Sequence, residues 1–117
     1  MSFIIKSRIW IDKNDAPFLG SGRIELLETI HKKGSISKAA SHLNMSYKKA
    51  WTLIKSMNTQ ANSPLVEKEI GGKNGGGSRL TPTGKSIIKT FRKLEKKNKK
   101  YLEKELMKCC FENDIRN

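Results

Sequence analysis

The sequence contains few of the residues that build disulfide frameworks, metal centres or membrane spans. Among its 117 residues are two cysteines, Cys109 and Cys110, and adjacent cysteines suit neither a disulfide framework nor the spacing of zinc ligands. No apolar run approaches the ~20 residues that cross a bilayer, and the N-terminus lacks a signal-peptide pattern. We therefore expect reduced thiols and a cytoplasmic protein, with a length that suits one domain.

Acidic residues are also scarce, and one long stretch has none. The sequence has 11 Asp and Glu residues against 24 Lys and Arg residues, which gives a net charge of +13. Between Thr29 and Val66 there is no acid, and the six basic residues are Lys32, Lys33, Lys38, Lys48, Lys49 and Lys55. A solvated surface explains any one of these lysines. A polyanionic partner such as DNA explains the whole acid-free stretch better.

The acid-free stretch contains two short segments with the apolar spacing of helices that bury one face. Their apolar positions are Ile36, Ala39, Ala40 and Leu43 in the first segment, and Tyr47, Ala50, Trp51, Ile54 and Met57 in the second. Asn44 tolerates the left-handed backbone that ends a helix, and Ser46 is a favourable N-cap. Two helices joined by a tight polar turn indicate a helix-turn-helix, with residues 46–58 as the recognition helix.

The segment before this unit predicts a strand. Residues 3–11 carry apolar side chains at alternate positions, with Phe3, Ile5, Ile9 and Ile11 on one face. Residues 12–17 have the composition of a turn-rich link.

One more helix is expected between this link and the helix-turn-helix. It begins at Ser21 or Gly22, and Gly34 ends it. Its inner face holds Ile24, Leu27 and Ile30. Ser35 and Ser37 both offer a cap for the next helix, and the sequence does not choose between them.

A glycine-rich segment after the recognition helix predicts a β-hairpin, the wing of a winged helix-turn-helix. Residues 65–70 and 78–81 are strand-like, and residues 71–77 include five glycines. Lys73 and Arg79 can then reach backbone phosphates or a minor groove. A phosphate-binding nucleotide loop is the alternative, but Lys73 is followed by Asn74 instead of Ser or Thr, and no helix starts at the lysine.

Thr81 and Pro82 form a strong start signal for a long helix over residues 82–108. Apolar residues recur with a 4,3,4,3 spacing that Asn98 interrupts, at Ile87, Phe91, Leu94 and Tyr101. This spacing predicts a seam for a partner helix, and thus dimerisation. Because the opposite face is basic, a helix that lies on a membrane surface is the alternative.

No residue pattern indicates catalysis, so we expect no enzyme. His31 and His42 have no Cys or acidic companions at the spacing of metal ligands, and no metal site is predicted. Glu25 with Glu28, and Glu67 with Glu69, are carboxylate pairs that are most simply interpreted as solvated faces.

Three motifs, GSISKAA, MSYKKAW and GGKNGGGSRLTPTG, resemble the N-terminal DNA-binding domain of the molybdate-responsive regulators of the ModE family, a branch of the LysR-type winged helices. The match covers roughly residues 20 to 95. The resemblance implies a dimer with two recognition helices in successive major grooves. Family members that sense molybdate carry it on C-terminal oxyanion-binding domains, and this chain ends shortly after the match. We therefore expect the chain to bind no molybdate.

The sequence thus predicts a mainly α fold with a small β-hairpin, a winged helix-turn-helix with an N-terminal strand and a long dimerisation helix. Its expected parts are residues 1–19, 20–81, 82–108 and a tail at 109–117. We predict a homodimeric, sequence-specific transcription regulator that binds palindromic double-stranded DNA without a cofactor. A sequence-neutral architectural DNA-binding protein and a peripheral membrane protein using residues 85–108 remain alternatives. The expected DNA contacts are Ser35, Ser37, Lys38, Ser46, Tyr47, Lys48, Lys49, Thr52, Lys55, Lys73, Asn74 and Arg79.

Overall fold

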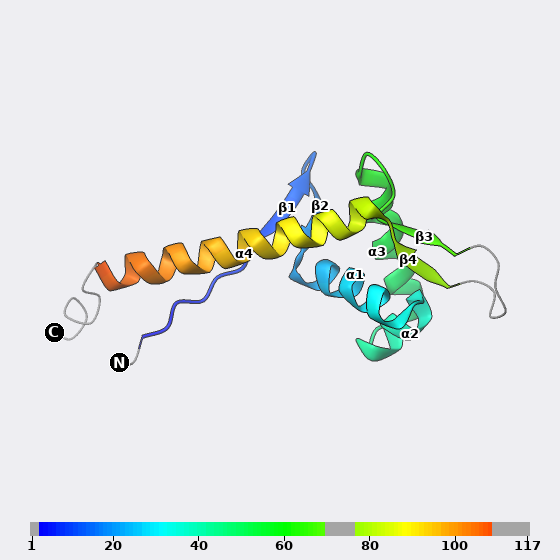
Figure 1. Ribbon diagram of the computed structural model, residues 1–117, viewed down its shortest axis with the longest axis horizontal. Helices are drawn as coiled ribbons and strands as arrows, with labels where there is room; N and C mark the ends of the chain where they lie inside the picture. Colours follow the sequence, from blue (N-terminus) through cyan, green and yellow to red (C-terminus); the bar gives the residue numbers. More distant parts are fainter. Residues whose placement is uncertain (1–2, 70–76, 109–117) are drawn as a thin grey trace.

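The computed structural model describes residues 3–69 and 77–108 and has a winged helix-turn-helix fold with one long projecting helix (Figure 1). Its extents are 66 × 28 × 22 Å. The elements in chain order are β1 (Trp10–Lys13), β2 (Ala16–Gly20), α1 (Ser21–Lys33), α2 (Ile36–His42), α3 (Tyr47–Gln60), β3 (Val66–Lys68), β4 (Ser78–Leu80) and α4 (Pro82–Lys108).

Short-range hydrogen bonds set the ends of the first three helices. Gly34 ends α1 with a left-handed φ of 81°, and its N–H donates to the carbonyl of Ile30 at 2.8 Å. Asn44 has the left-handed φ of 57° expected after α2. Ser46 caps α3, because its Oγ accepts from the N–H of Lys49 at 3.0 Å. These features confirm the predicted turn between α2 and α3.

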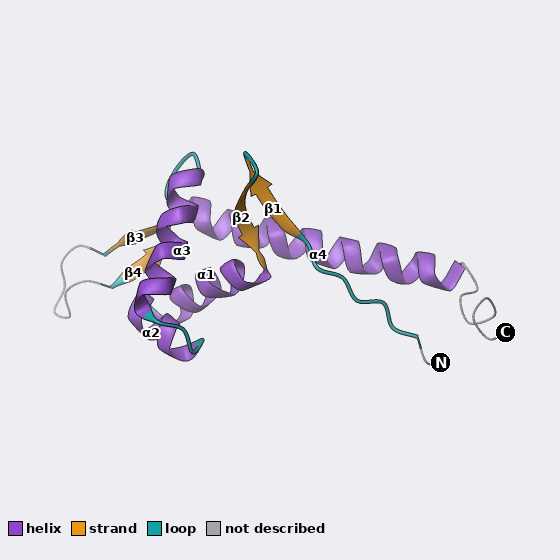
Figure 2. Cartoon of the chain, turned by 180° about the vertical axis from the view of Figure 1, so that it is seen from behind, coloured by secondary structure: helices purple, strands orange, loops and turns teal. Residues whose placement is uncertain are grey.

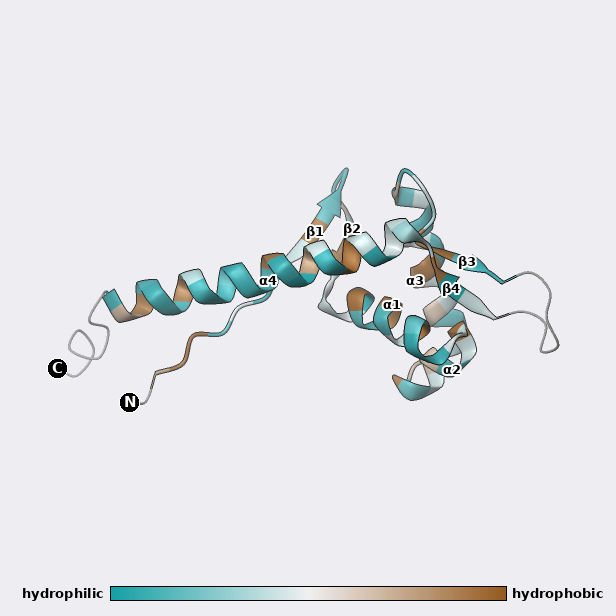
Figure 3. Ribbon diagram, in the orientation of Figure 1, coloured by the Kyte–Doolittle hydropathy of each residue, from teal (hydrophilic) through white to brown (hydrophobic). Residues whose placement is uncertain are grey.

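The core lies where α1, α2, α3 and the first half of α4 meet. Figure 3 shows apolar segments on α1 and on the neighbouring part of α4. Ala39, Ala40 and Ala50 are buried at the contact of α2 with α3, where small side chains let the two helices approach closely. The largest fully buried side chains are Phe91, Ile24, Leu26, Leu27, Ile30, Met57 and Leu65.

The prediction of a strand over residues 3–11 is wrong, because the first strand, β1, begins at Trp10. The chain instead forms an antiparallel hairpin of β1 and β2, and residues 3–9 have no strand pairing. Asn14 and Asp15 turn the hairpin with φ values of 52° and 64°, and two positive φ angles are typical of tight hairpin turns. The segment interpreted as a link, residues 12–17, therefore contains the end of β1, the turn and the start of β2. Residues 3–9 extend alongside α4 (Figures 1 and 2), and Asn98 Nδ2 donates to Ser7 Oγ at 3.0 Å.

The wing is formed by β3 and β4, which pair antiparallel with Glu67 opposite Arg79. Both strands are shorter than predicted, and Ile70 lies outside the described residues. The side chain of Asn58 anchors the start of the wing to α3: its Oδ1 accepts from the N–H of Leu65 at 2.8 Å and its Nδ2 donates to the carbonyl of Val66 at 3.0 Å. The orientation of the wing is thus tied to the recognition helix.

The long helix α4 begins as predicted at Pro82. Thr81 caps it, because its Oγ1 accepts from the N–H of Gly84 at 3.0 Å. An ideal Cβ at Gly84 would lie 2.3 Å from the carbonyl oxygen of Leu65, so only glycine fits there. Farther along, Phe91 is 0% exposed in the core of its own subunit. The predicted seam residue Phe91 therefore packs the fold and offers no surface to a partner helix.

Candidate nucleic-acid interface

The outer face of α3 presents the residues that the sequence places at DNA. The first turn of α3 exposes Tyr47, Lys48 and Lys49, and Thr52 and Lys55 continue the exposed face. Buried Ala50, Ile54 and Met57 hold the opposite face of α3 against the core. The hydroxyl of Thr52 donates to the carbonyl of Lys48 at 2.8 Å, which leaves its methyl group and oxygen lone pairs for an outside contact.

Two residues that the apolar spacing placed on the buried face lie on the surface. Tyr47 is 53% exposed and Trp51 is 43% exposed. The three buried positions of α3 already fill the space against α2, so these larger rings are left outside it. The Nζ of Lys55 lies 5.1 Å from the ring centroid of Trp51, a cation–π geometry. Trp51 was not among the predicted DNA contacts, although its place one turn after Tyr47 was visible in the sequence.

The start of α2 lies beside the recognition helix and supplies three predicted contacts. Ser35 is the cap: its Oγ accepts from the N–H of Lys38 at 3.0 Å. Ser37 and the side chain of Lys38 are exposed in the first turn of α2. The structure thus resolves the choice of cap that the sequence left open.

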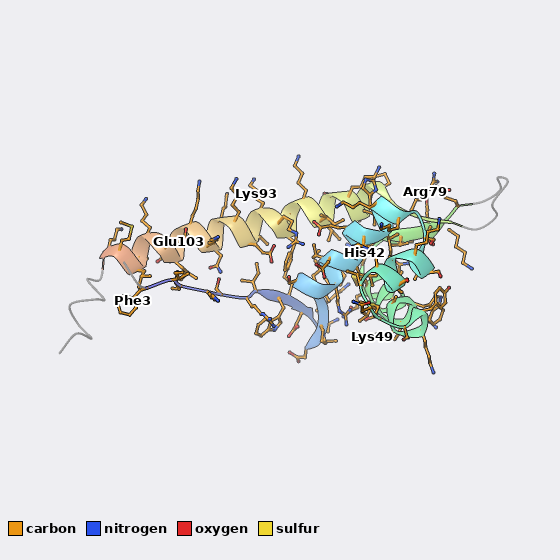
Figure 4. The ribbon with its side chains drawn as sticks, turned by 90° about the horizontal axis from the view of Figure 1, so that it is seen from below. Phe3, His42, Lys49, Arg79, Lys93 and Glu103 are labelled. Atoms are coloured by element: carbon orange, nitrogen blue, oxygen red, sulfur yellow. The ribbon has the colours of Figure 1, made fainter. Side chains whose placement is uncertain are left out.

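The wing contributes fewer contacts to the described surface than predicted. Lys73 and Asn74 lie outside the described residues. Arg79 is exposed on β4, but its Nη2 pairs with Glu67 Oε1 at 3.0 Å and its Nε donates to the same oxygen at 3.2 Å. A phosphate that approaches Arg79 therefore has to compete with the carboxylate of Glu67. Figure 4 shows Lys49 and Arg79 at the same end of the molecule, away from Lys93 and Glu103 on α4.

An ion-pair cluster joins α1 to α4. The guanidinium of Arg92 binds Glu28 Oε1 at 2.6 Å and Glu95 Oε1 at 2.7 Å. The hydrogen bonds that Arg92 donates to Glu28, and then those to Glu95, raise the pKa of Arg92. Glu25 is exposed as predicted, whereas Glu28 is half-buried and pairs with Arg92, so the two carboxylates are only partly a solvated face. These acids lie on α1 and α4, so the recognition helix keeps a surface of one sign.

A half-buried arginine, which sequence reasoning missed, bonds to the recognition helix from α1. Arg23 of α1 donates from Nη1 to Ser56 Oγ on α3 at 3.3 Å. Burial lowers the pKa of Arg23, because desolvation disfavours its charged form. This hydrogen bond links α1 to α3. Nothing in the sequence spacing pairs residues from two separate helices.

The described residues include no group of three or more His, Cys, Asp or Glu side chains placed to hold a metal ion. Within the same residues, no helix has both the length and the apolar character needed to span a bilayer.

The fold, the capped recognition helix and the wing define a winged helix-turn-helix regulator, and comparison with known proteins gives the family. Residues 22–85 match the lysR family of bacterial regulatory helix-turn-helix proteins, and the chain belongs to this family. The ModE-like character predicted from the three motifs is confirmed by relatives with that name.

"Molybdenum transport protein ModE" of Azotobacter vinelandii is 43% identical over 76% of this chain and 33% of its own length. "DNA-binding transcriptional dual regulator ModE" of Escherichia coli K12 is 43% identical over 63% of this chain and 28% of its own length. The chain thus spans about a third of the length of these relatives. The crystal structure of ArgP from Mycobacterium tuberculosis has a similar fold, with a TM-score of 0.52 and 20% identity over 71% of this chain and 29% of that one.

Proposed function

We propose that this chain is a sequence-specific DNA-binding transcription regulator that acts as a homodimer on a palindromic operator. The observation that carries the proposal is the acid-free, exposed first turn of α3, backed by a buried apolar face. A helix of 14 residues is about 21 Å long, and its width suits the major groove of B-DNA. Tyr47, Lys48 and Lys49 then face base edges and nearby phosphates.

The wing and α2 are proposed to contact the backbone on either side of the recognition helix. Ser37 and Lys38 at the start of α2 face one strand, and the wing with Lys68 and Arg79 faces the other. Contacts of this kind position the protein without reading sequence. The relative from Escherichia coli K12, which is named a DNA-binding transcriptional dual regulator, supports regulation of transcription. Contact with DNA through these side chains requires no cofactor.

The proposed dimer uses the half of α4 that projects beyond the core. Leu94 is 43% exposed and Tyr101 is 62% exposed, and they lie two turns apart on one face of the helix. Ile87 is partly buried against the subunit's own core, so it lies at the edge of this surface. A two-fold pairing of the helices would present two recognition helices to successive major grooves, about 34 Å apart.

Selection of bound duplexes from a random pool tests the proposed function. The expected result is one enriched, two-fold symmetric sequence that binds on the order of 10³-fold or more tightly than random DNA. Binding that is equally tight for all duplexes would support the sequence-neutral architectural alternative. Co-flotation with anionic vesicles in place of DNA binding would support the membrane alternative.

A further inference from the structure

Trp51 is the feature of the recognition helix that its fold does not explain. It lies on the same helix as buried Ala50 and Ile54, but 43% of its surface is exposed. Together with Tyr47 and Lys55 it forms a row of side chains one turn apart, since these residues are spaced by four. Residues spaced by four share one face of the helix, so a partner that contacts Tyr47 and Lys55 also meets the ring of Trp51.

The surroundings of Trp51 place it on the side of the recognition helix that faces the wing. It lines a depression of about 350 Å³ whose other walls include Lys55 and Thr59 from α3 and Glu67 and Lys68 from β3. Glu67 is the one acid among the residues that line this depression, and Arg79 holds its carboxylate at 3.0 Å. The depression is therefore open to a polyanion, and the ring lies beside the path of a DNA strand that touches both α3 and the wing.

The chemistry of the major groove names the group that an indole ring contacts there. Every base pair presents hydrogen-bonding atoms in the major groove. The apolar group that the groove presents is the C5-methyl of thymine. The ammonium of Lys55, 5.1 Å from the ring centroid, is held by the ring and is free to bond a phosphate. The two side chains would then make different contacts: the indole ring with a thymine methyl group, and the ammonium with a phosphate of the DNA backbone beside it.

We infer that Trp51 is a specificity-determining residue, which contacts the methyl group of one thymine in each half-site and positions Lys55 against an adjacent phosphate. This assignment rests on the proposed function, because it requires α3 to lie in the major groove.

Replacement of thymine by uracil in the operator removes only the methyl group and therefore tests the contact directly. Each thymine of the selected duplex is changed in turn to uracil, and binding is measured for the wild-type chain and for Trp51→Ala. For the wild-type chain, uracil at one position of the half-site should lower the affinity about fourfold per half-site. This is the factor that corresponds to the burial of one methyl group. Trp51→Ala should bind the thymine and uracil forms of that position equally.

Three matched variants separate this role from a structural one. Trp10 is the other tryptophan of the chain and is 67% exposed on β1. Trp10→Ala should therefore keep the wild-type response to uracil. Trp51→Phe keeps an aromatic ring and should retain part of that response, even if Trp51→Ala folds poorly. Lys55→Gln should weaken all duplexes, lower the salt slope by about one and leave the uracil response unchanged.

The outcomes distinguish this assignment from the proposed function. If no sequence is enriched from the random pool, the proposed function fails, and the assignment of Trp51 fails with it. If a sequence is enriched but uracil has the same effect on the wild-type chain and on both Trp51 variants at every position, the assignment of Trp51 alone is overturned.

Discussion

The recognition helix α3 and the projecting half of α4 are both rich in lysine, but their charges are arranged differently. On α3 no acid accompanies Lys48, Lys49 and Lys55. On the projecting half of α4 three acids, Glu95, Glu103 and Glu105, are interspersed among the more numerous lysines, and Lys108 pairs with Glu105 at 3.3 Å. Each of these acids offsets the charge of a neighbouring lysine, whereas on α3 the charges of one sign add without any offset. The absence of acids on α3, and not the number of lysines, therefore favours α3 over α4 as the proposed DNA contact.

The two helices also differ in what lies behind them. α3 is capped by Ser46, backed by three buried residues and tied to the wing through Asn58. The described buried residues of α4 are Gly84 and Phe91, both before the projecting half. A rigidly supported face can read bases with fixed geometry. A projecting helix with exposed Leu94 and Tyr101 instead offers apolar surface to a second copy.

The largest effect is expected from a double substitution on α4, Leu94→Glu with Tyr101→Glu. Two carboxylates opposite their symmetry mates cannot be solvated in a helix pair, so the chain should become monomeric. Affinity for a duplex with two half-sites should fall by about 10²- to 10⁴-fold, while binding to one half-site changes little. Light scattering and gel shift on the same samples measure both effects.

The control for this substitution removes the same amount of charge from the opposite face of α4. Lys89→Gln with Lys96→Gln also lowers the net charge by two, at exposed positions away from the proposed seam. This variant should remain a dimer. A wild-type chain that is monomeric at micromolar concentration, both free and on DNA, would contradict the dimer.

Gly84→Ala should disrupt the contact between the start of α4 and the backbone of Leu65, which precedes the wing. The new Cβ would collide with the backbone of Leu65, and overpacking of this kind lowers the free energy of unfolding by about 1–3 kcal/mol. Gly22→Ala is the matched control, because no atom lies within 4 Å of its ideal Cβ. That change should be neutral or stabilising by up to about 1 kcal/mol. Thermal unfolding measures the stability of both variants. Equal stability of Gly84→Ala and Gly22→Ala would show that α4 does not approach the backbone of Leu65 closely at Gly84.

The division between base reading and backbone contact is tested by Lys48→Ala against Arg79→Ala. Loss of a base contact at Lys48 should cost about 1–3 kcal/mol on the selected operator and relax the preferred sequence. Arg79→Ala should weaken selected and random duplexes about equally, and by less, because Glu67 already occupies the guanidinium. Competition binding distinguishes the two residues. If Lys48→Ala lowers the affinity for selected and random duplexes equally, Lys48 does not contact bases.

The smallest effect is expected at the start of α2, where two serines two residues apart have different roles. Ser35→Ala removes the cap on the N–H of Lys38 and should lower the free energy of unfolding by about 1 kcal/mol. Ser37→Ala removes an exposed hydroxyl and should leave stability unchanged. Its effect should appear only in DNA affinity. Chemical denaturation of the two variants gives the difference, and a larger loss for Ser37→Ala would reverse the assignment of the cap.

The sequence by itself determined those features that depend on neighbours within one or two helical turns. Asn44, Ser46 and the pair Thr81–Pro82 set helix ends through contacts at most a few residues away, so their residue types were sufficient to predict them. The apolar spacing likewise identified the core positions of α1 and α2. Together with the glycine run, these signals predicted the order of the helix-turn-helix, the wing and the long helix.

Only the tertiary structure decided which apolar and charged side chains find partners far away in the chain. Arg92 pairs with Glu28, which lies 64 residues earlier in the chain. Phe91 is buried in the core and Trp51 is exposed, although both belong to apolar series with regular helical spacing. The N-terminal segment behaves in the same way: its alternating pattern predicts a strand, but residues 3–9 lie along α4 without one. Helical spacing fixes which side chains share a face. What that face meets depends on how the elements pack, and the sequence period does not record it.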